Sequence, residues 1–331
     1  MKKLTYLTIT LTMFISCTRQ PNKFPELTGA YLGQKLPGDS AVLFAPGIVS
    51  TGCSERDIVF TPDGNEIFFR RSIGLIYSTI FHTKKENGKW LEPEVFEYCT
   101  DTRYKYLEPF ITADGKKLFF VSNKPVSGEE PGSYDIWVSE KNNRNEWGEP
   151  YNIGEPVNTG GNDYFPTLTK DGVLYYTALD TSLKEEFIYR SKFVNGKYTK
   201  PEKLNEKVNG GKARYNAAIA YDESYIIVPM YGTSDSPNNT NYYILFRDEN
   251  DHWSNPINLE KYLKSGGGWS ITTSPDQKYL FFMSAKVSKN MVKVLSRDKI
   301  NELHNNPQNG NPDIYWIKSD FIEDLREQAE F

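Results

Sequence analysis

The stretch FTPDGNEIFF at residues 60–69 decides the fold, because variants of it return four more times along the chain. Each copy has an apolar strand, an Asp-Gly type of turn and then an aromatic, β-branched strand, which is the pattern of a β-hairpin. The aspartates that mark the five turns are Asp63, Asp114, Asp171, Asp222 and Asp276. They lie 51, 57, 51 and 54 residues apart, and a period near fifty is typical of propeller blades.

Each repeat also contains a third and a fourth segment, so it has the strand content of one blade. The fourth segment is predicted where an aromatic residue is followed by a proline three positions later. The four aromatic residues of this motif are Trp90, Trp147, Tyr198 and Trp253. The fifth repeat has no such segment, and the chain ends instead in a predicted short amphipathic helix within residues 317–331. We therefore expect residues 41–49 to supply the outer strand of the fifth blade and to close the ring.

The predicted fold class is all-β, a five-bladed β-propeller of four-stranded antiparallel blades closed by an N-terminal strand. Two repeats depart from the turn pattern, because Glu223 and Gln277 stand where the other turns have glycine. Glycine is the residue that adopts positive φ without steric cost. We expect altered turns in blades four and five, with their strands retained.

The phrases TPDGNEIFF, ADGKKLFF and SPDQKYLFF resemble the PD40 or WD40-like repeats of TolB-type propellers. Three further segments, at residues 31–38, 44–52 and 313–325, resemble a group of exported Bacteroidetes lipoproteins of this kind. The resemblance covers nearly the whole mature chain and implies a propeller in the cell envelope. It carries little information on function.

The N-terminus has the pattern of a secretory signal, with Lys2 and Lys3 before an apolar run that ends at Cys17. The residues before Cys17 resemble a lipobox, which implies that this cysteine is lipidated. We expect a signal peptide at 1–16, a lipidated cysteine and tether at 17–30, and one propeller domain at 31–331. No aspartate follows Cys17, which by the same resemblance implies the outer membrane, with either side open. An ordinary signal peptide with an incidental cysteine is the alternative.

Composition limits the partners and cofactors. The chain of 331 residues has a formal net charge of −4, so it lacks the basic footprint of a nucleic-acid binder. The histidines His82, His252 and His304 lie far apart and form no metal-binding spacing. The sequence has no GxSxG motif and no glycine loop that would cradle phosphates. We expect no metal and no cofactor, and membrane contact through a lipid anchor alone.

Ligand-binding residues are predicted at the top face, the end of the channel opposite the Asp-Gly turns. Counting back six to eight residues from each turn aspartate finds charged and aromatic side chains where the first strands approach this face. The carboxylates that could act as catalytic residues are Glu55, Asp57, Glu108 and Asp163. The candidate ligand-binding residues are Arg56, Tyr106, Tyr164, Arg214, Tyr215, Asn216 and Trp269. Such a mixture suits a polar, hydroxyl-rich or charged small ligand, although hydrogen bonding among the side chains themselves explains it equally well.

Two other features of the top face leave alternatives open. Cys53 and Cys99 are expected on neighbouring connections, so they could form a disulfide or remain free thiols. The long segment at 285–312 contains Lys286, Lys289, Lys293 and Arg297. It could cap the mouth of the channel and attract an anion, or it could be a solvated surface helix.

Three functions remain open from the sequence. We favour an envelope lipoprotein that binds a polar or carbohydrate-like ligand or a partner protein at the top face of the channel. A second reading is a glycoside hydrolase or polysaccharide lyase that uses the carboxylates with tyrosine and arginine. A third is a pure protein-interaction scaffold like TolB, which predicts no small-molecule pocket.

Overall fold

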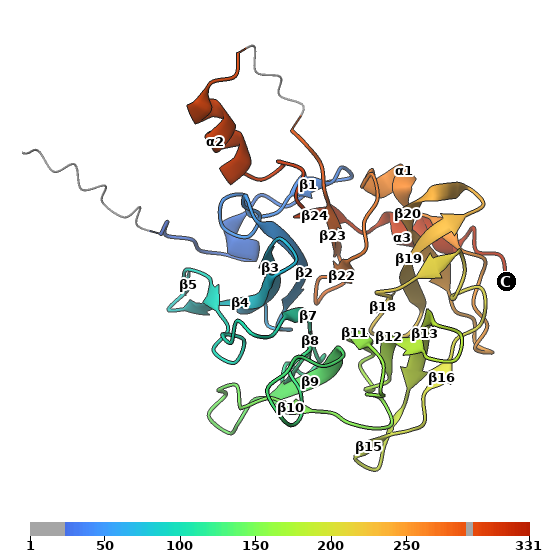
Figure 1. Cartoon of the computed structure of the whole chain (residues 1–331). Helices are drawn as coiled ribbons and strands as arrows, with labels where there is room; N and C mark the ends of the chain where they lie inside the picture. Colours follow the sequence, from blue (N-terminus) through green and yellow to red (C-terminus); the bar gives the residue numbers. More distant parts are fainter. Residues whose placement is uncertain (1–23, 289–293) are drawn as a thin grey trace, which may run out of the picture.

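The computed structural model describes residues 24–288 and 294–331 and forms a five-bladed β-propeller. In Figure 1 the sheets surround a central channel, with the first strand of each blade innermost. Blade 1 contains β2 (Ser54–Phe60), β3 (Glu66–Ile73), β4 (Tyr77–Glu86), β5 (Lys89–Trp90) and β6 (Glu94–Val95), and blade 2 contains β7 (Tyr106–Ile111), β8 (Lys117–Ser122), β9 (Asp135–Glu140) and β10 (Tyr151–Asn152). Blade 3 contains β11 (Asp163–Leu168), β12 (Leu174–Asp180), β13 (Glu185–Ser191) and β16 (Glu202–Lys203), and blade 4 contains β17 (Ala213–Arg214), β18 (Ala218–Ile219), β19 (Tyr225–Thr233), β20 (Ser236–Phe246) and β21 (Ile257–Asn258).

Blade 5 is completed by the N-terminal part of the chain, as predicted. Its sheet contains β22 (Ile271–Thr273), β23 (Tyr279–Ser284), β24 (Asp313–Lys318) and β1 (Val42–Leu43). Val42 lies opposite Trp316 in an antiparallel pair. The next residue, Phe44, is fully buried, with its ring centroid 5.2 Å from that of Trp316. Pairing of the two chain ends leaves the last blade without a naked edge.

The Asp-Gly turns of blades 1, 2, 4 and 5 are closed by equivalent backbone hydrogen bonds, and the turn of blade 3 is one residue shorter. In blade 1 the Asp63 carboxylate accepts a hydrogen bond from the Thr61 hydroxyl at 2.6 Å and one from the Asn65 backbone N–H at 3.1 Å. The residue after the aspartate has positive φ, and Glu223 (65°) and Gln277 (56°) adopt it as the glycines do. The expectation of altered turns in blades 4 and 5 is therefore wrong. The side-chain and backbone hydrogen bonds of the aspartate hold the conformation without glycine.

The aromatic-to-proline motif lies just before the outer strand and does not form it. In blades 1 to 4 the outer strands β6, β10, β16 and β21 begin after the proline. The aromatic residue instead pairs with the end of the third strand, as Lys141 does with Trp147 and Arg247 with Trp253. In blade 3 this pairing forms a separate hairpin of β14 (Phe193–Val194) and β15 (Lys197–Tyr198).

Helices are few and short. They comprise a 3-10 helix at Tyr31–Gly33, α1 (Glu260–Leu263), α2 (Arg297–Asn305) and α3 (Phe321–Arg326), the last matching the predicted C-terminal helix. No helix in the described part of the chain is long and apolar enough to cross a membrane. Cys17 and the predicted signal peptide lie outside the described residues. Part of the expected tether contacts blade 1, because the Leu27 carbonyl accepts a hydrogen bond from the Trp90 backbone N–H.

Candidate functional site

A belt of buried polar side chains joins the blades near the top of the channel. The Arg56 guanidinium lies 3.0 Å from an Asp57 carboxylate oxygen and 2.9 Å from Glu108 Oε1. The other Asp57 oxygen accepts a hydrogen bond from the Ser270 hydroxyl of blade 5. The other Glu108 oxygen accepts one from the Phe165 backbone N–H of blade 3 at 2.8 Å. These contacts link blades 5, 1, 2 and 3.

Asn216 completes this polar belt on the side of blade 4. Its amide nitrogen donates to the Trp269 carbonyl of blade 5 at 2.6 Å, and its backbone N–H donates to the Thr177 hydroxyl of blade 3 at 2.9 Å. Four belt positions, at Asp57, Glu108, Phe165 and Asn216, share a left-handed φ between 53° and 58°. The strand pairing shifts register at this point in blades 1 to 3, so a bulge re-aims the side chains.

The charges of the belt are mutually compensating. Burial raises the pKa of Glu108 to about 7, and Arg56 acts in the opposite direction. Burial alone would lower the pKa of Arg56, but Asp57 and Glu108 outweigh it and raise this pKa. A buried charge is tolerated only when it is paired and hydrogen-bonded. Arg56, Asp57 and Glu108 therefore have a structural task at the centre of the ring.

Below the belt the channel is closed. The inner strands of all five blades leave a cavity of about 20 Å³, lined by residues such as Phe60, Phe110, Thr167, Ile219 and Thr272. A space of this size holds about one water molecule. A ligand that enters from the top face therefore cannot pass through the propeller.

Above the belt a cavity of about 880 Å³ opens at the mouth of the channel. We call it the mouth cavity. It is lined by Thr51, Gly52, Cys53, Ser54, Arg56, Arg70, Ser72, Ile73, Gly74, Leu75, Trp269, His304, Asn305, Asn311 and Pro312. Trp269 is 41% exposed, so its indole presents an open aromatic surface there. The volume lies in the range of small-molecule sites.

Arg70 is the exceptional residue of the mouth cavity. It lies directly opposite Arg56 on the neighbouring strand, and two like charges in such a pair repel each other. Its Nε donates to the Ser78 hydroxyl at 2.8 Å, and within residues 24–288 and 294–331 it forms no ion pair. Burial, followed by the charge of Arg56, lowers the pKa of Arg70 to about 10. The cavity thus contains a guanidinium that forms no contact ion pair in the described residues, although Asp57 and Glu108 partly offset its charge from a longer distance.

Sequence reasoning missed Arg70, because the count was confined to the first strand of each blade. A partial signal was present, because Arg56 precedes the turn aspartate Asp63 by seven residues and Arg70 follows it by seven. The two residues pair only because of the bulge, since Val59 and Phe68, nearer the turn, lie four and five residues from Asp63. Their two charges then meet on one face.

Several other predicted site residues lie elsewhere. Glu55 and Asp163 are fully buried, and each accepts hydrogen bonds from the threonine four residues earlier in the chain. Glu55 accepts hydrogen bonds from the Thr51 backbone N–H at 3.0 Å and from Arg71 at 2.9 Å, whereas Asp163 accepts one from the Thr159 backbone N–H at 2.6 Å. These carboxylates hold the connections into the inner strands and do not line the mouth cavity.

The remaining candidates also have partners within the fold. Arg214 donates to the Asn209 carbonyl at 3.0 Å and lies over the Phe187 ring. Tyr106 is buried beside Phe120. Tyr215 exchanges a hydrogen bond with Thr240 at 2.9 Å, and burial raises the pKa of Tyr164. Of the eleven candidates, Arg56 and Trp269 line the mouth cavity, while Asp57, Glu108 and Asn216 form the belt beneath it.

The long loop contributes to the mouth cavity through α2. His304 and Asn305 from the end of α2 lie on its wall. Gly52 faces them so closely that a Cβ there would lie 2.7 Å from the Asn305 carbonyl carbon. Lys289 and Lys293 fall outside the described residues. The capping role expected for this loop stays a prediction.

The described residues contain no group of three or more His, Cys, Asp or Glu side chains able to hold a metal ion. Cys53 and Cys99 are both free. Cys99 is buried, and burial raises the pKa of its thiol well above the ordinary value. A protonated, buried thiol is a poor nucleophile.

The fold and site define a β-propeller with a cavity at the mouth of its channel. No protein-family model and no curated protein sequence matches the chain. Among solved structures, it is similar to TolB from Acinetobacter baumannii (16% identity, TM-score 0.46, 80% of this chain and 57% of that one). It is also similar to a putative TolB from Agrobacterium tumefaciens (12%, 0.46, 80% and 90%) and to a luciferin-regenerating enzyme (6%, 0.45, 83% and 94%). The chain thus spans little more than half of the Acinetobacter protein, and identities this low concern the fold alone.

Proposed function

We propose that the protein binds a small, hydroxyl-rich ligand that carries a carboxylate, such as an acidic sugar, in the mouth cavity. The observation that carries this proposal is Arg70, a largely buried guanidinium without an ion pair in a protein of net charge −4. An anionic ligand would give this guanidinium the contact ion pair that it lacks within the described residues. Arginine suits the task because its planar fork binds a carboxylate through two parallel hydrogen bonds.

The rest of the mouth cavity supports a carbohydrate-like ligand. The exposed Trp269 ring offers a flat surface on which a sugar can stack, and Ser54, Ser72 and Asn311 supply hydroxyl and amide groups. A few polar groups placed around an aromatic surface are typical of small-ligand sites. The closed channel beneath makes the cavity a dead end, as expected for binding and not for passage.

The geometry favours binding over hydrolysis. A glycosidase needs two carboxyl groups that flank the bond to be cleaved. The nearest candidates, Asp57 and Glu108, are both buried and both bound to Arg56. Neither lines the mouth cavity. We further propose that the protein is exported, lipidated at Cys17 and anchored to the outer membrane. It would meet its ligand or a partner protein there.

Titration calorimetry with galacturonate and galactose tests this proposal. Galacturonate should bind at low salt and galactose at least about tenfold more weakly, because a hydrogen bond to a charged group contributes about 1.5–3 kcal/mol. Arg70→Met should weaken galacturonate binding by a similar factor. Arg103→Met is the matched control, since Arg103 is exposed and pairs with Asp101. Equal affinity for the two sugars, or unchanged affinity in Arg70→Met, would contradict the proposal.

A further inference from the structure

The aromatic residue before each outer strand occupies one equivalent position in blades 1 to 4. In every case the backbone N–H of the following residue donates to a carbonyl near the end of the third strand. The donor and acceptor pairs are Leu91 and Lys84, Gly148 and Glu140, Thr199 and Lys192, and Ser254 and Phe246. Trp90, Trp147, Tyr198 and Trp253 are therefore structural counterparts, and their surroundings can be compared directly.

The three tryptophans each fill the junction between their own blade and the preceding one. Trp147 is 8% exposed and packs edge-on against Phe68 of blade 1, with ring centroids 5.6 Å apart. Its indole N–H donates to Glu66 of blade 1 at 2.9 Å. Trp253 and Trp90 are buried in clusters with residues of blades 3 and 5, respectively. The junction between blades 4 and 5 is filled by Ile322 and Leu325 of α3.

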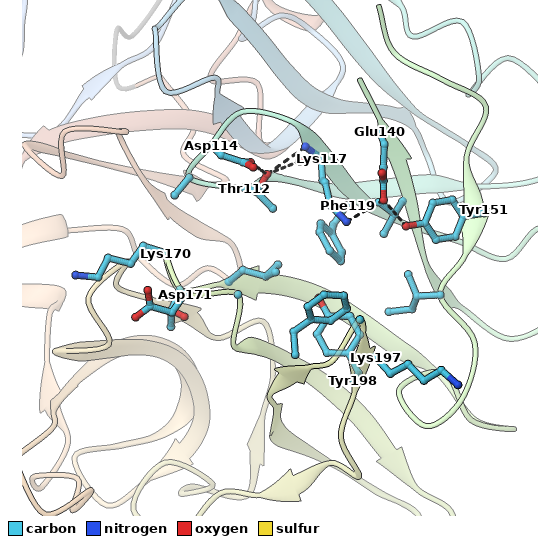
Figure 2. A pocket seen from close by; sticks show the side chains of 18 of the residues that line it. Thr112, Asp114, Lys117, Phe119, Glu140, Tyr151, Lys170, Asp171, Lys197 and Tyr198 are labelled. Atoms are coloured by element: carbon cyan, nitrogen blue, oxygen red, sulfur yellow. Dashed lines mark hydrogen bonds and ion pairs between the residues drawn. The ribbon is translucent and has the colours of Figure 1, made fainter. Parts of the chain in front are cut away.

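At the Asp-Gly end the junction between blades 2 and 3 is open, although Tyr198 packs against the core that the two blades share. Tyr198 stands at the position of the tryptophans, and a cavity of about 730 Å³ lies there, opposite Phe119 (Figure 2). We call it the junction cleft. Phe193, the pairing partner of Tyr198, is 46% exposed. The Tyr198 hydroxyl makes no hydrogen bond within the described part of the chain. This junction therefore presents Phe193 to solvent, whereas the three tryptophans of the other blades are buried.

The polar edge of the junction cleft also differs from that of its neighbour. Lys117 occupies the place that Glu66 has in blade 1. Both begin the second strand, and the backbone carbonyl of each accepts a hydrogen bond from the threonine two residues before the turn aspartate. Its Nζ lies 2.9 Å from Glu140, which accepts a further hydrogen bond from the Tyr151 hydroxyl at 2.6 Å. Figure 2 shows this group on one side of the cleft and Tyr198 on the other. The cleft therefore combines an aromatic and aliphatic floor with an anionic acceptor at its rim.

We propose that the junction cleft binds a small molecule with a flat aromatic ring that carries a hydrogen-bond donor at its edge. The neighbouring junction contains such a group, because the Trp147 indole lies against Phe68 and donates to a carboxylate there. In the junction cleft Phe119 offers the same kind of surface and Glu140 the acceptor. The cleft is at the Asp-Gly end of the channel, lined by Asp114 and Asp171. It is thus separate from the mouth cavity and independent of the proposed acidic-sugar site.

Binding of indole to the full mature protein, followed by calorimetry and ligand-observed NMR, tests this assignment. We expect saturable binding with a Kd of about 1 mM or tighter, as a good fragment of this size attains. Phenol should bind more tightly than cyclohexanol, which has the same hydroxyl group on a ring that is not flat. Tyr198→Trp should place the protein's own indole in the part of the cleft over Phe119, weaken binding more than about tenfold and raise Tm by about 2 °C or more. Tyr77→Trp, at an exposed tyrosine outside the cleft, is the control and should leave indole affinity unchanged.

Three results would overturn the assignment. The first is no saturable binding of indole or phenol by the wild-type protein. The second is indole binding that is equally tight in a folded Tyr198→Trp variant, which would place the site elsewhere. The third is a Tm for Tyr198→Trp at or below that of the wild type, because the cleft would then lack the shape of the missing tryptophan.

Discussion

Individual residues of the polar belt hold a backbone conformation that their side chains disfavour. Left-handed φ is uncommon for residues other than glycine, and for Phe165 it is costly. The belt hydrogen bonds compensate, because Glu108 accepts from the Phe165 N–H and Asn216 spans to blade 5. Counting back from the turns identified the belt residues. The bulge decides where each side chain points, but it cannot be recognised from the alternation of apolar and polar residues along the strand. This explains why Glu55 and Asp163 lie away from the mouth cavity.

Glu108 should give the protein a specific pH dependence. Its pKa is raised to about 7 by burial, so the folded state binds its proton more tightly than the unfolded state does. The stability that this group contributes is complete below about pH 4.5 and is lost as the pH rises through about 7. Over this pH range the free energy of unfolding of the wild type should therefore fall by about 1–3 kcal/mol more than that of Glu108→Gln, which has no carboxyl group at this position.

Urea denaturation of both proteins from pH 4.5 to 7.5 measures this difference. Asp163 and Asp313 also have raised pKa values, but they are present in both proteins and cancel. A constant difference in free energy of unfolding across the range would show that Glu108 is not the group that titrates.

Arg70 combines a predicted loss of binding with a gain in stability. Arg70→Met removes a charge that repels Arg56 and forms no contact ion pair within residues 24–288 and 294–331. We expect the free energy of unfolding to rise by about 1 kcal/mol. Residues retained for ligand binding often lower the stability of the ligand-free protein, so replacing one of them raises it. Chemical denaturation without ligand measures this change, with Arg103→Met as the control. Destabilisation by more than about 1 kcal/mol would indicate that Arg70 has a structural partner.

At the scale of the element, the aromatic-to-proline motif shows what a sequence pattern can and cannot reveal. The repeat made the motif visible in four blades, but its position after the third strand suggested an outer strand. The outer strands are only two residues long, too short for any periodicity to mark them. The aromatic residue has instead the task of filling a junction between blades, which depends on contacts with the preceding repeat.

Replacing the aromatic side chain by alanine at two equivalent positions compares a filled junction with the open one. Trp147→Ala should lower the free energy of unfolding by about 3–5 kcal/mol, because it leaves a cavity and deprives Glu66 of a hydrogen bond. Tyr198→Ala should cost clearly less, since its junction is already open. Guanidinium denaturation of the two variants provides the comparison. Equal losses would contradict the distinction between the junctions.

At the scale of the whole molecule, the ring depends on its closing strand. The number of blades and the closure by residues 41–49 could be predicted, because the repeat count left one strand missing at one end and one spare at the other. The mouth cavity could not be predicted, since its wall combines a first strand, a second strand and α2. These segments come together only when the ring is closed.

The closing strand itself contains a matched pair of positions. Phe44→Ala should destabilise the protein by about 3–5 kcal/mol, because the ring is fully buried among Phe60, Phe281 and Trp316. Val42→Ala, two residues earlier and 43% exposed, should cost less than about 1 kcal/mol. A single cooperative transition in calorimetry is expected for both. Loss of one blade's signal ahead of the others in Phe44→Ala would contradict closure as the feature that makes the ring one unit.

A crystal structure of the protein with galacturonate tests whether Arg70, which forms no ion pair within the described residues, makes the mouth cavity an anion site. We expect a carboxylate bound by the Arg70 guanidinium and a sugar ring against Trp269, with the Arg56, Asp57 and Glu108 contacts unchanged. A mouth cavity that remains empty at saturating ligand, or a sugar bound there with its carboxylate turned away from Arg70, would contradict it.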